Sequence, residues 1–238
     1  MQIHAWPRAW HGLFENGRFH LTSGSQVSSN PWAGRQNVYG PHRQLWRCEL
    51  KMVPLQDADW MSVSAFFSEA GGQAGFIRIA DPRRLKPQYN RVATLTQQPW
   101  SDDTYFSDGT GWVEGGVPAT FHVAEFAARG ATHLVVGGLP ASVPRLLRRG
   151  DLIEIRRGGI ADHVPSLHEI VRDAPTDANG RTGLSIRPGL RKAVMPGDQI
   201  VSDHPTGVFR CIDDDQGIVD VTPPSIGRTG FTLVEAII

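Results

Sequence analysis

The sequence of 238 residues contains little cysteine, no net charge and no long apolar run. Its two cysteines, Cys48 and Cys211, are too few for a disulfide framework or for a zinc site made only of thiolates. Basic and acidic residues number 24 each, so no overall field attracts nucleic acid or an anionic membrane. No stretch has the length needed to cross a bilayer, and the first ten residues lack the parts of a secretion signal. We therefore expect synthesis in a cytoplasm and no membrane partner.

Chain-turning residues are abundant, with 26 glycines and 17 prolines, which favours many short strands over a helical bundle. The clearest strand is Leu45 to Met52, where apolar and charged side chains alternate. Since side chains on a strand point alternately to its two faces, this pattern predicts one apolar sheet face. The residues expected on that face are Trp46, Cys48, Leu50 and Met52.

Residues 56–70 carry the one pattern typical of an α-helix. Asp57 is the expected N-cap, and Gly71-Gly72 is expected to end the helix. Apolar residues recur at helical spacing and predict a buried stripe. That stripe consists of Trp60, Val63, Phe66, Phe67 and Ala70.

Three short segments have the composition of hairpin turns: Asn16-Gly17, Asp177 to Gly180, and Asp213 to Gly217. The last would join strands at 208–212 and 218–221. Residues 23–43 hold no period and are expected to form a long loop or an extended arm. Further strands are expected at 75–79, 133–136, 152–156, 167–172, 183–187, 199–202 and 231–238.

Motifs for bond chemistry are incomplete. His168-Glu169 resembles the start of a zinc protease motif, but position 172 is Arg where the second His belongs. The acidic segment 213–217 is followed only by Asp220 as a distal carboxylate, so a solvated turn is favoured over a calcium loop. Basic clusters at 83–86 and 145–157 favour a solvated loop or ion pairs between subunits over nucleic-acid contact. We expect no enzyme activity, no metal site and no cofactor.

Several segments together resemble one known family. Ser29 to Gln36, followed by Gly40-Pro41 and Leu45-Trp46, resembles the opening "Ser-x-Pro-(apolar)-x-Gly-x-x-Gln … Pro-Gly … Trp", with the Gly-Pro pair reversed. Asp59 to Pro82 resembles the segment that follows it, which ends "Phe-Arg-Leu-x-Asp-Pro". The second half continues in the same order with segments 147–152, 167–173, 179–182, 186–191 and 205–210.

This pattern is similar to that of the distal tail proteins of long-tailed bacteriophages, over about three quarters of the chain. The resemblance implies an all-β chain in which a split β-barrel or β-sandwich builds a ring of six copies and an inserted small β-barrel faces outward. It implies a ring domain of residues 1–90 and 205–238 and an inserted domain of residues 91–204. The last strand would close the sheet started by Leu45 to Met52.

The resemblance also implies partners and a location. The partners would be further copies of the chain, the tail tube protein, the baseplate hub protein, and the tape measure or tail fibre proteins. The location would be the tail tip of the virion, assembled in the host cytoplasm. The arm expected to reach a neighbouring subunit contains Asn30, Pro31, Trp32, Gly34 and Gln36.

Two other functions stay open at this point. A carbohydrate-binding module at a phage tail tip would use aromatic side chains of the inserted domain to stack on sugars. A cell-wall hydrolase would need two convergent carboxylates or a metal triad in a cleft. The aromatic candidates for the first are Trp100, Tyr105, Trp112 and Phe121.

Overall fold

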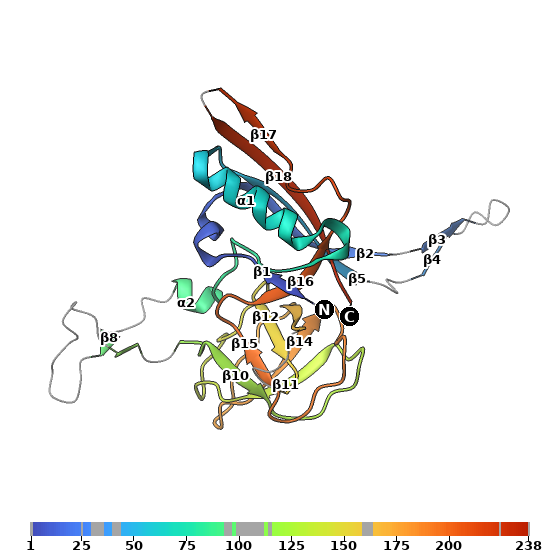
Figure 1. The fold of residues 1–238 in the computed structure, drawn as a ribbon. Helices are drawn as coiled ribbons and strands as arrows, with labels where there is room; N and C mark the ends of the chain where they lie inside the picture. The colour runs from blue at the N-terminus through green and yellow to red at the C-terminus, as the bar shows by residue number, and fades with distance from the viewer. Residues whose placement is uncertain are drawn as a thin grey trace. The chain divides into compact units, whose positions relative to one another are not determined.

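A computed structural model describes residues 2–24, 26–29, 36–39, 44–92, 97–98, 112–113, 116–158, 164–223 and 225–237. The chain divides into two compact units, of which the sheet unit is Met1–Pro82 with Val208–Ile238 and the barrel unit is Arg83–Gly207. Figure 1 shows the barrel unit in green to orange, inserted between blue and red parts of the sheet unit. Strands dominate the described residues, which confirms the all-β class.

The sheet unit has one eight-stranded sheet with the order β1-β7-β16-β18-β5-β2, to which β17 and β6 add by pairing with β18. The last strand, β18, pairs with β5, as the sequence predicted. The elements of this sheet are β1 (Ile3–Ala5), β2 (Phe14–Ser23), β5 (Gln44–Met52), β6 (Leu55–Gln56), β7 (Phe76–Ala80), β16 (Thr206–Cys211), β17 (Val219–Thr222) and β18 (Ile226–Glu235).

The alternation in β5 has the predicted effect. Trp46, Cys48, Leu50 and Met52 are all buried, with at most 3% of any of them exposed. They belong to the inner face of the sheet, where the helix α1 (Asp57–Ala70) contributes Phe67, whose ring lies 4.9 Å from that of Phe231. Burial of such aromatic side chains is the main stabilising contribution to this unit.

The helix has the expected length but begins differently. Its N-cap is Gln56, without a side-chain hydrogen bond, so the prediction that Asp57 is the cap was wrong. Gly71 ends the helix with a φ of 74°, a conformation that glycine adopts without strain. The prediction of a single α-helix was also wrong, because α2 (Gln88–Val92) is a second one; two short 3-10 helices are η1 (Arg8–Gly12) and η2 (Gly72–Ala74).

Two predicted hairpins are absent. Asn16-Gly17 lies inside β2, next to a bulge, and a Cβ atom at Gly17 would lie 2.6 Å from Cδ2 of Leu50. Close packing against Leu50 therefore accounts for Gly17. The tight turn that Asn16-Gly17 predicted does not form. Segment 213–217 is not a hairpin turn either, since β16 and β17 both pair with β18.

Residues 23–43 were expected to form an irregular loop or arm. The structure describes part of this segment as two paired strands, β3 (Gln26–Ser29) and β4 (Gln36–Tyr39). The residues between these strands lie outside the described part of the chain, and so the predicted contact with a neighbouring subunit stays a prediction.

The barrel unit contains a closed barrel with the strand order β10-β11-β14-β13-β12-β15. Fully buried aliphatic side chains such as Leu134, Ile153 and Leu184 form its core, so the barrel encloses no channel. Its strands are β10 (Thr120–Val123), β11 (His133–Gly137), β12 (Leu152–Arg156), β13 (Ser166–Ile170), β14 (Thr182–Arg187) and β15 (Gln199–Val201); the unit also has β8 (Gln97–Gln98) paired with β9 (Trp112–Val113).

The barrel uses the same turn twice, before β12 and before β15. In each turn an aspartate accepts a 2.8 Å hydrogen bond from the backbone N–H three residues earlier: Asp151 from Arg148, and Asp198 from Met195. The preceding glycine has a φ of 92° or 93°, which other residues rarely adopt. The second carboxylate oxygen of Asp151 accepts the N–H of Gln88 at 2.8 Å.

The hydrogen bond between Gln88 and Asp151 helps to explain where the boundary between the two units lies. The sequence placed the division at 90/91 and 204/205, whereas the units in the structure meet at 82/83 and 207/208. Gln88 lies at the start of α2, and its hydrogen bond to Asp151 attaches this helix to the barrel. Arg84 adds a 3.2 Å ion pair with Glu169 on β13. Residues 83–90 thus belong with the barrel.

We expect Asp151→Ala and Asp198→Ala each to lower the free energy of unfolding by about 1–3 kcal/mol, because each leaves part-buried backbone N–H groups without an acceptor. Urea denaturation followed by circular dichroism measures this. The matched control is Glu125→Ala, which removes an exposed carboxylate from the same unit and should change stability by less than about 0.5 kcal/mol. Equal effects of all three substitutions would contradict the role given to the two aspartates.

Candidate functional site

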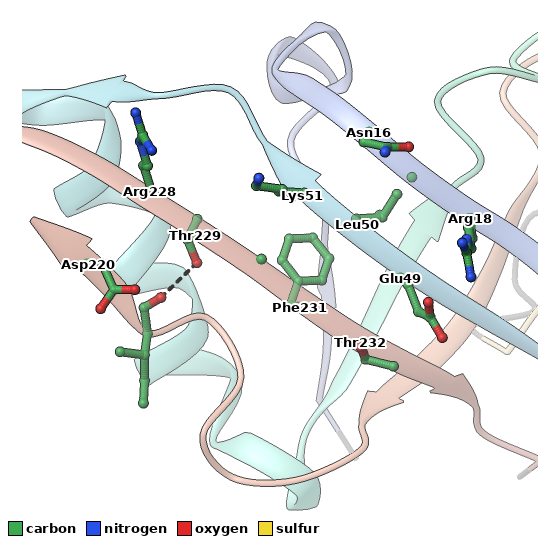
Figure 2. Close-up of a pocket in the computed structure, with 13 residues that line it drawn as sticks. Asn16, Arg18, Glu49, Leu50, Lys51, Asp220, Arg228, Thr229, Phe231 and Thr232 are labelled. Carbon is green, nitrogen blue, oxygen red and sulfur yellow. Dashed lines mark hydrogen bonds between the residues drawn. The ribbon is translucent and has the colours of Figure 1, made fainter.

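The outer face of the sheet unit carries a concave surface lined with charged side chains. Residues paired directly across strands share a face. One row on this face is Thr232, Glu49 and Arg18; the next is Gly230, Lys51 and Asn16. Figure 2 shows these side chains along β18, β5 and β2.

The face is hollowed where Gly230 lacks a side chain. The hollow has a volume of about 630 Å³, and a Cβ atom at Gly230 would already lie 3.3 Å from the carbonyl oxygen of Leu50. Glycine thus leaves space between Lys51 and the next outward residue of β18, Arg228. The charged side chains that line the hollow are Arg18, Glu49, Lys51, Asp220 and Arg228.

Some of the charges on this face are paired and some are not. Arg47 Nε lies 3.1 Å from Glu49 Oε1, and Lys51 Nζ lies 3.8 Å from Glu15 Oε2. Exposed pairs of this kind contribute about 0–1 kcal/mol each. Within the described part of the chain, Arg18 and Arg228 take part in no ion pair, so their charges are directed at solvent or at another molecule.

The polar groups that line the hollow are carboxylates, guanidinium groups, an ammonium group, an amide and threonine hydroxyls. Its lining, among the described residues, contains no serine, cysteine or histidine that could act as nucleophile or base. Its two carboxylates, Glu49 on β5 and Asp220 on β17, lie on opposite sides of β18. Their partners on β18 are four residues apart along that strand. Strand geometry puts their backbones about 16 Å apart, whereas glycosidase carboxyl groups lie about 5–9.5 Å apart. The geometry required by the hydrolase alternative is not met by this pair.

His168, the one histidine that the sequence singled out, is a buried core residue of the barrel. Its Nδ1 lies 2.8 Å from the carbonyl oxygen of Pro188, which can only accept, so Nδ1 carries the hydrogen. Its Nε2 lies 3.0 Å from Ser166 Oγ and accepts the hydroxyl hydrogen. Burial away from water lowers the pKa of His168 to about 4. No cluster of three or more potential metal ligands occurs among the described residues.

Most of the other predicted site residues cannot be placed. Residues 30–34 of the predicted arm lie outside the described residues, and Gln36 is described only as backbone in β4. Trp100 and Tyr105 also lie outside, and Trp112 is described only as backbone in β9. Phe121 is a buried core residue of the barrel, with 5% exposed, so its prediction as a sugar-stacking residue was wrong. The arm and the other three aromatic residues stay predictions.

The basic cluster at 145–157 is partly used within the barrel. Arg145 Nε forms a 2.7 Å ion pair with Asp173, and the backbone N–H of Arg149 donates to the same carboxylate. The guanidinium of Arg148 lies over the ring of Tyr89, 5.8 Å from its centre. These contacts lie within the barrel unit, and the expected ion pairs between subunits stay a prediction.

Sequence reasoning missed the outer face because it joins four strands that are far apart along the chain. Arg18 and Lys51 belong to the first quarter of the sequence, and Asp220 and Arg228 to its end. In the sequence, the apolar Phe231 and Leu233 are separated by the polar Thr232, and this alternation indicated a strand with one buried face. The register of β18 against β5, which creates the face, was not visible in the sequence.

Comparison with models of protein families finds no match to the chain, and comparison with curated proteins finds no significant relative. Among the described residues, no helix combines the length and the apolar character that crossing a membrane requires.

Burial of His168 predicts a loss of stability on acidification. Its pKa is about 4 in the folded protein and about 6.5 in the unfolded chain, so the unfolded chain binds the proton first as pH falls. The contribution of His168 is full above about pH 6.5 and is lost by about pH 4, amounting to about 3 kcal/mol. Urea denaturation across this range measures it.

His168→Gln should show a shallower pH dependence over the same range, because the titrating group is absent. His133→Gln, which changes an exposed histidine of the same barrel, should retain the dependence of the wild type. A wild-type profile identical to that of His168→Gln would contradict the assignment.

Proposed function

We propose that the chain is a structural subunit of the tail tip of a long-tailed bacteriophage or a related particle, where copies form a ring that connects the tail tube to the baseplate hub. The observation that supports this most is the insertion of a closed barrel into a sheet unit made from the two ends of the chain. The resemblance to distal tail proteins implies that arrangement of a ring domain interrupted by a small β-barrel domain.

The positions of the shared motifs agree with this proposal. Segment 147–152 is the aspartate turn before β12, and segment 167–173 is β13 with the residues that follow it. Segment 179–182 leads into β14, and segment 205–210 leads along β16 back into the sheet. The motifs therefore mark the turns and strands that build the barrel and return the chain to the sheet, which are positions where structure constrains sequence.

In this proposal the sheet unit is the ring domain, and its finer architecture is the split β-barrel or β-sandwich of the family. The β3–β4 hairpin is the base of the arm that reaches a neighbouring copy. The barrel unit lies outside the ring. Partners are the tail tube and hub proteins, with the tape measure or tail fibre proteins as further candidates. The proposed function depends on rigid packing and on the geometry of the contacts between subunits. It involves no making or breaking of covalent bonds.

Ring assembly can be tested by negative-stain electron microscopy of the purified wild-type chain over a series of concentrations. We expect closed rings of six copies, with the same diameter at every concentration, because a heterologous contact that closes on itself fixes the number of subunits. Protein that stays monomeric at the highest concentration, or that forms open filaments, would contradict the proposal.

A further inference from the structure

We propose that neighbouring copies in the ring meet head to tail through opposite faces of the sheet unit, the outer face of one copy against the helix side of the next. This inference rests on the proposed function, since it names the surface through which the copies assemble. Its basis is the difference in charge between the two faces.

The outer face has an excess of positive charge. Arg18, Arg210 and Arg228 lie on it and form no ion pair within the described residues. Arg47 and Lys51 are compensated by Glu49 and Glu15, which leaves Asp220 as the acidic residue without such a partner. The three arginines are on β2, β16 and β18, so the positive charge extends from the β2 edge across the sheet to β16.

The helix side has an excess of negative charge. The helix α1 contains no lysine, arginine or histidine, and Asp59 and Glu69 are exposed on it. The exposed loop Asp213–Asp215 lies beside its C-terminal end, where Asp214 Oδ1 accepts the N–H of Gln73 at 2.9 Å. Gly217, which follows this loop in the chain, packs against the ring of Phe67 on the helix. Arg8 of η1 is also exposed in the sheet unit and carries the opposite charge.

These charges select the geometry of the contact. A symmetric dimer would place each face against its own copy and bring like charges together, which opposes association. Contact between the two different faces brings opposite charges together, and repetition of a heterologous contact produces a ring when the rotation closes. A second copy of the chain is therefore the occupant that the outer face fits.

The shapes of the two faces agree with this choice. The outer face has the hollow at Gly230, with a volume of about 630 Å³. The helix side presents Met61, of which 53% is exposed, and Ile212, of which 40% is exposed. A flexible methionine suits an open hollow of mixed polarity, because it adapts its shape to the available space. Burial of these side chains adds an apolar contribution to the charge contact.

Charge reversal on each face tests the inference. One variant carries Lys51→Glu and Arg228→Glu on the outer face, and the other carries Asp59→Lys and Asp215→Lys on the helix side. The matched control carries Arg172→Glu and Lys192→Glu, two exposed positions of the barrel unit. Circular dichroism and thermal melting confirm that each variant is folded, and sedimentation velocity at low and high salt measures assembly.

We expect each face variant alone to assemble about tenfold or more weakly than the wild type at low salt. A mixture of the two should recover hetero-oligomers, because each supplies the charge that the other has lost. The control should assemble like the wild type, and assembly of the wild type should weaken as salt increases.

The outcomes separate the two proposals. If the wild type assembles into rings and both face variants assemble equally well, the ring stands and this interface is wrong. If the face variants fail and their mixture does not recover assembly, the pairing of these two faces is wrong. If the wild type itself stays monomeric, the proposed function fails before the interface is tested.

Discussion

The sheet unit depends on the pairing of β18 with strands on both of its sides. β18 is hydrogen-bonded to β16 and β17 along one edge and to β5 and β6 along the other. Its inward residues Phe231 and Leu233 are buried against the aromatic core under α1. Because β5 comes early in the chain and β18 last, the sheet is complete only after the whole chain, barrel included, has been made.

Because β5 and β18 pair directly, the sheet unit accommodates a complete barrel in the chain between them. The barrel has its own buried core, and its six strands pair with one another in a closed order. The hydrogen bonds of Asp151 and Asp198 fix the turns before β12 and β15 within the same unit. Each unit therefore has its own set of paired strands and its own buried apolar residues, so the surface of either unit can carry a separate contact.

Local features of the fold could be predicted from the sequence. The alternation in Leu45 to Met52 and the helical stripe at 57–70 were correct because each depends on residues close together in the chain. Asn16-Gly17 was misread because the same two residues suit a tight turn and a crowded position inside a strand, and only the neighbouring Leu50 distinguishes them. Segment 213–217 was misread because β18 supplies the partner edge for both flanking strands.

The candidate site was beyond sequence reasoning for the same physical reason. Its charged residues come from β2, β5, β17 and β18, and only the register of these strands places Arg18, Lys51 and Arg228 around the space left by Gly230. The sequence instead drew attention to aromatic residues and to an arm that lie outside the described part of the chain or are described only as backbone. Properties of a surface made by strand pairing between distant segments are not visible in a linear pattern.

In the sheet unit, β18 holds early and late segments of the chain in one sheet. Native-state hydrogen exchange, resolved by residue, measures this role directly. If the account is correct, the amides of β18 that pair with β5 and β16 exchange only through unfolding of the whole sheet unit, with a free energy equal to its global stability. Exchange of these amides at the rate of a frayed chain end, while β5 stays protected, would contradict it.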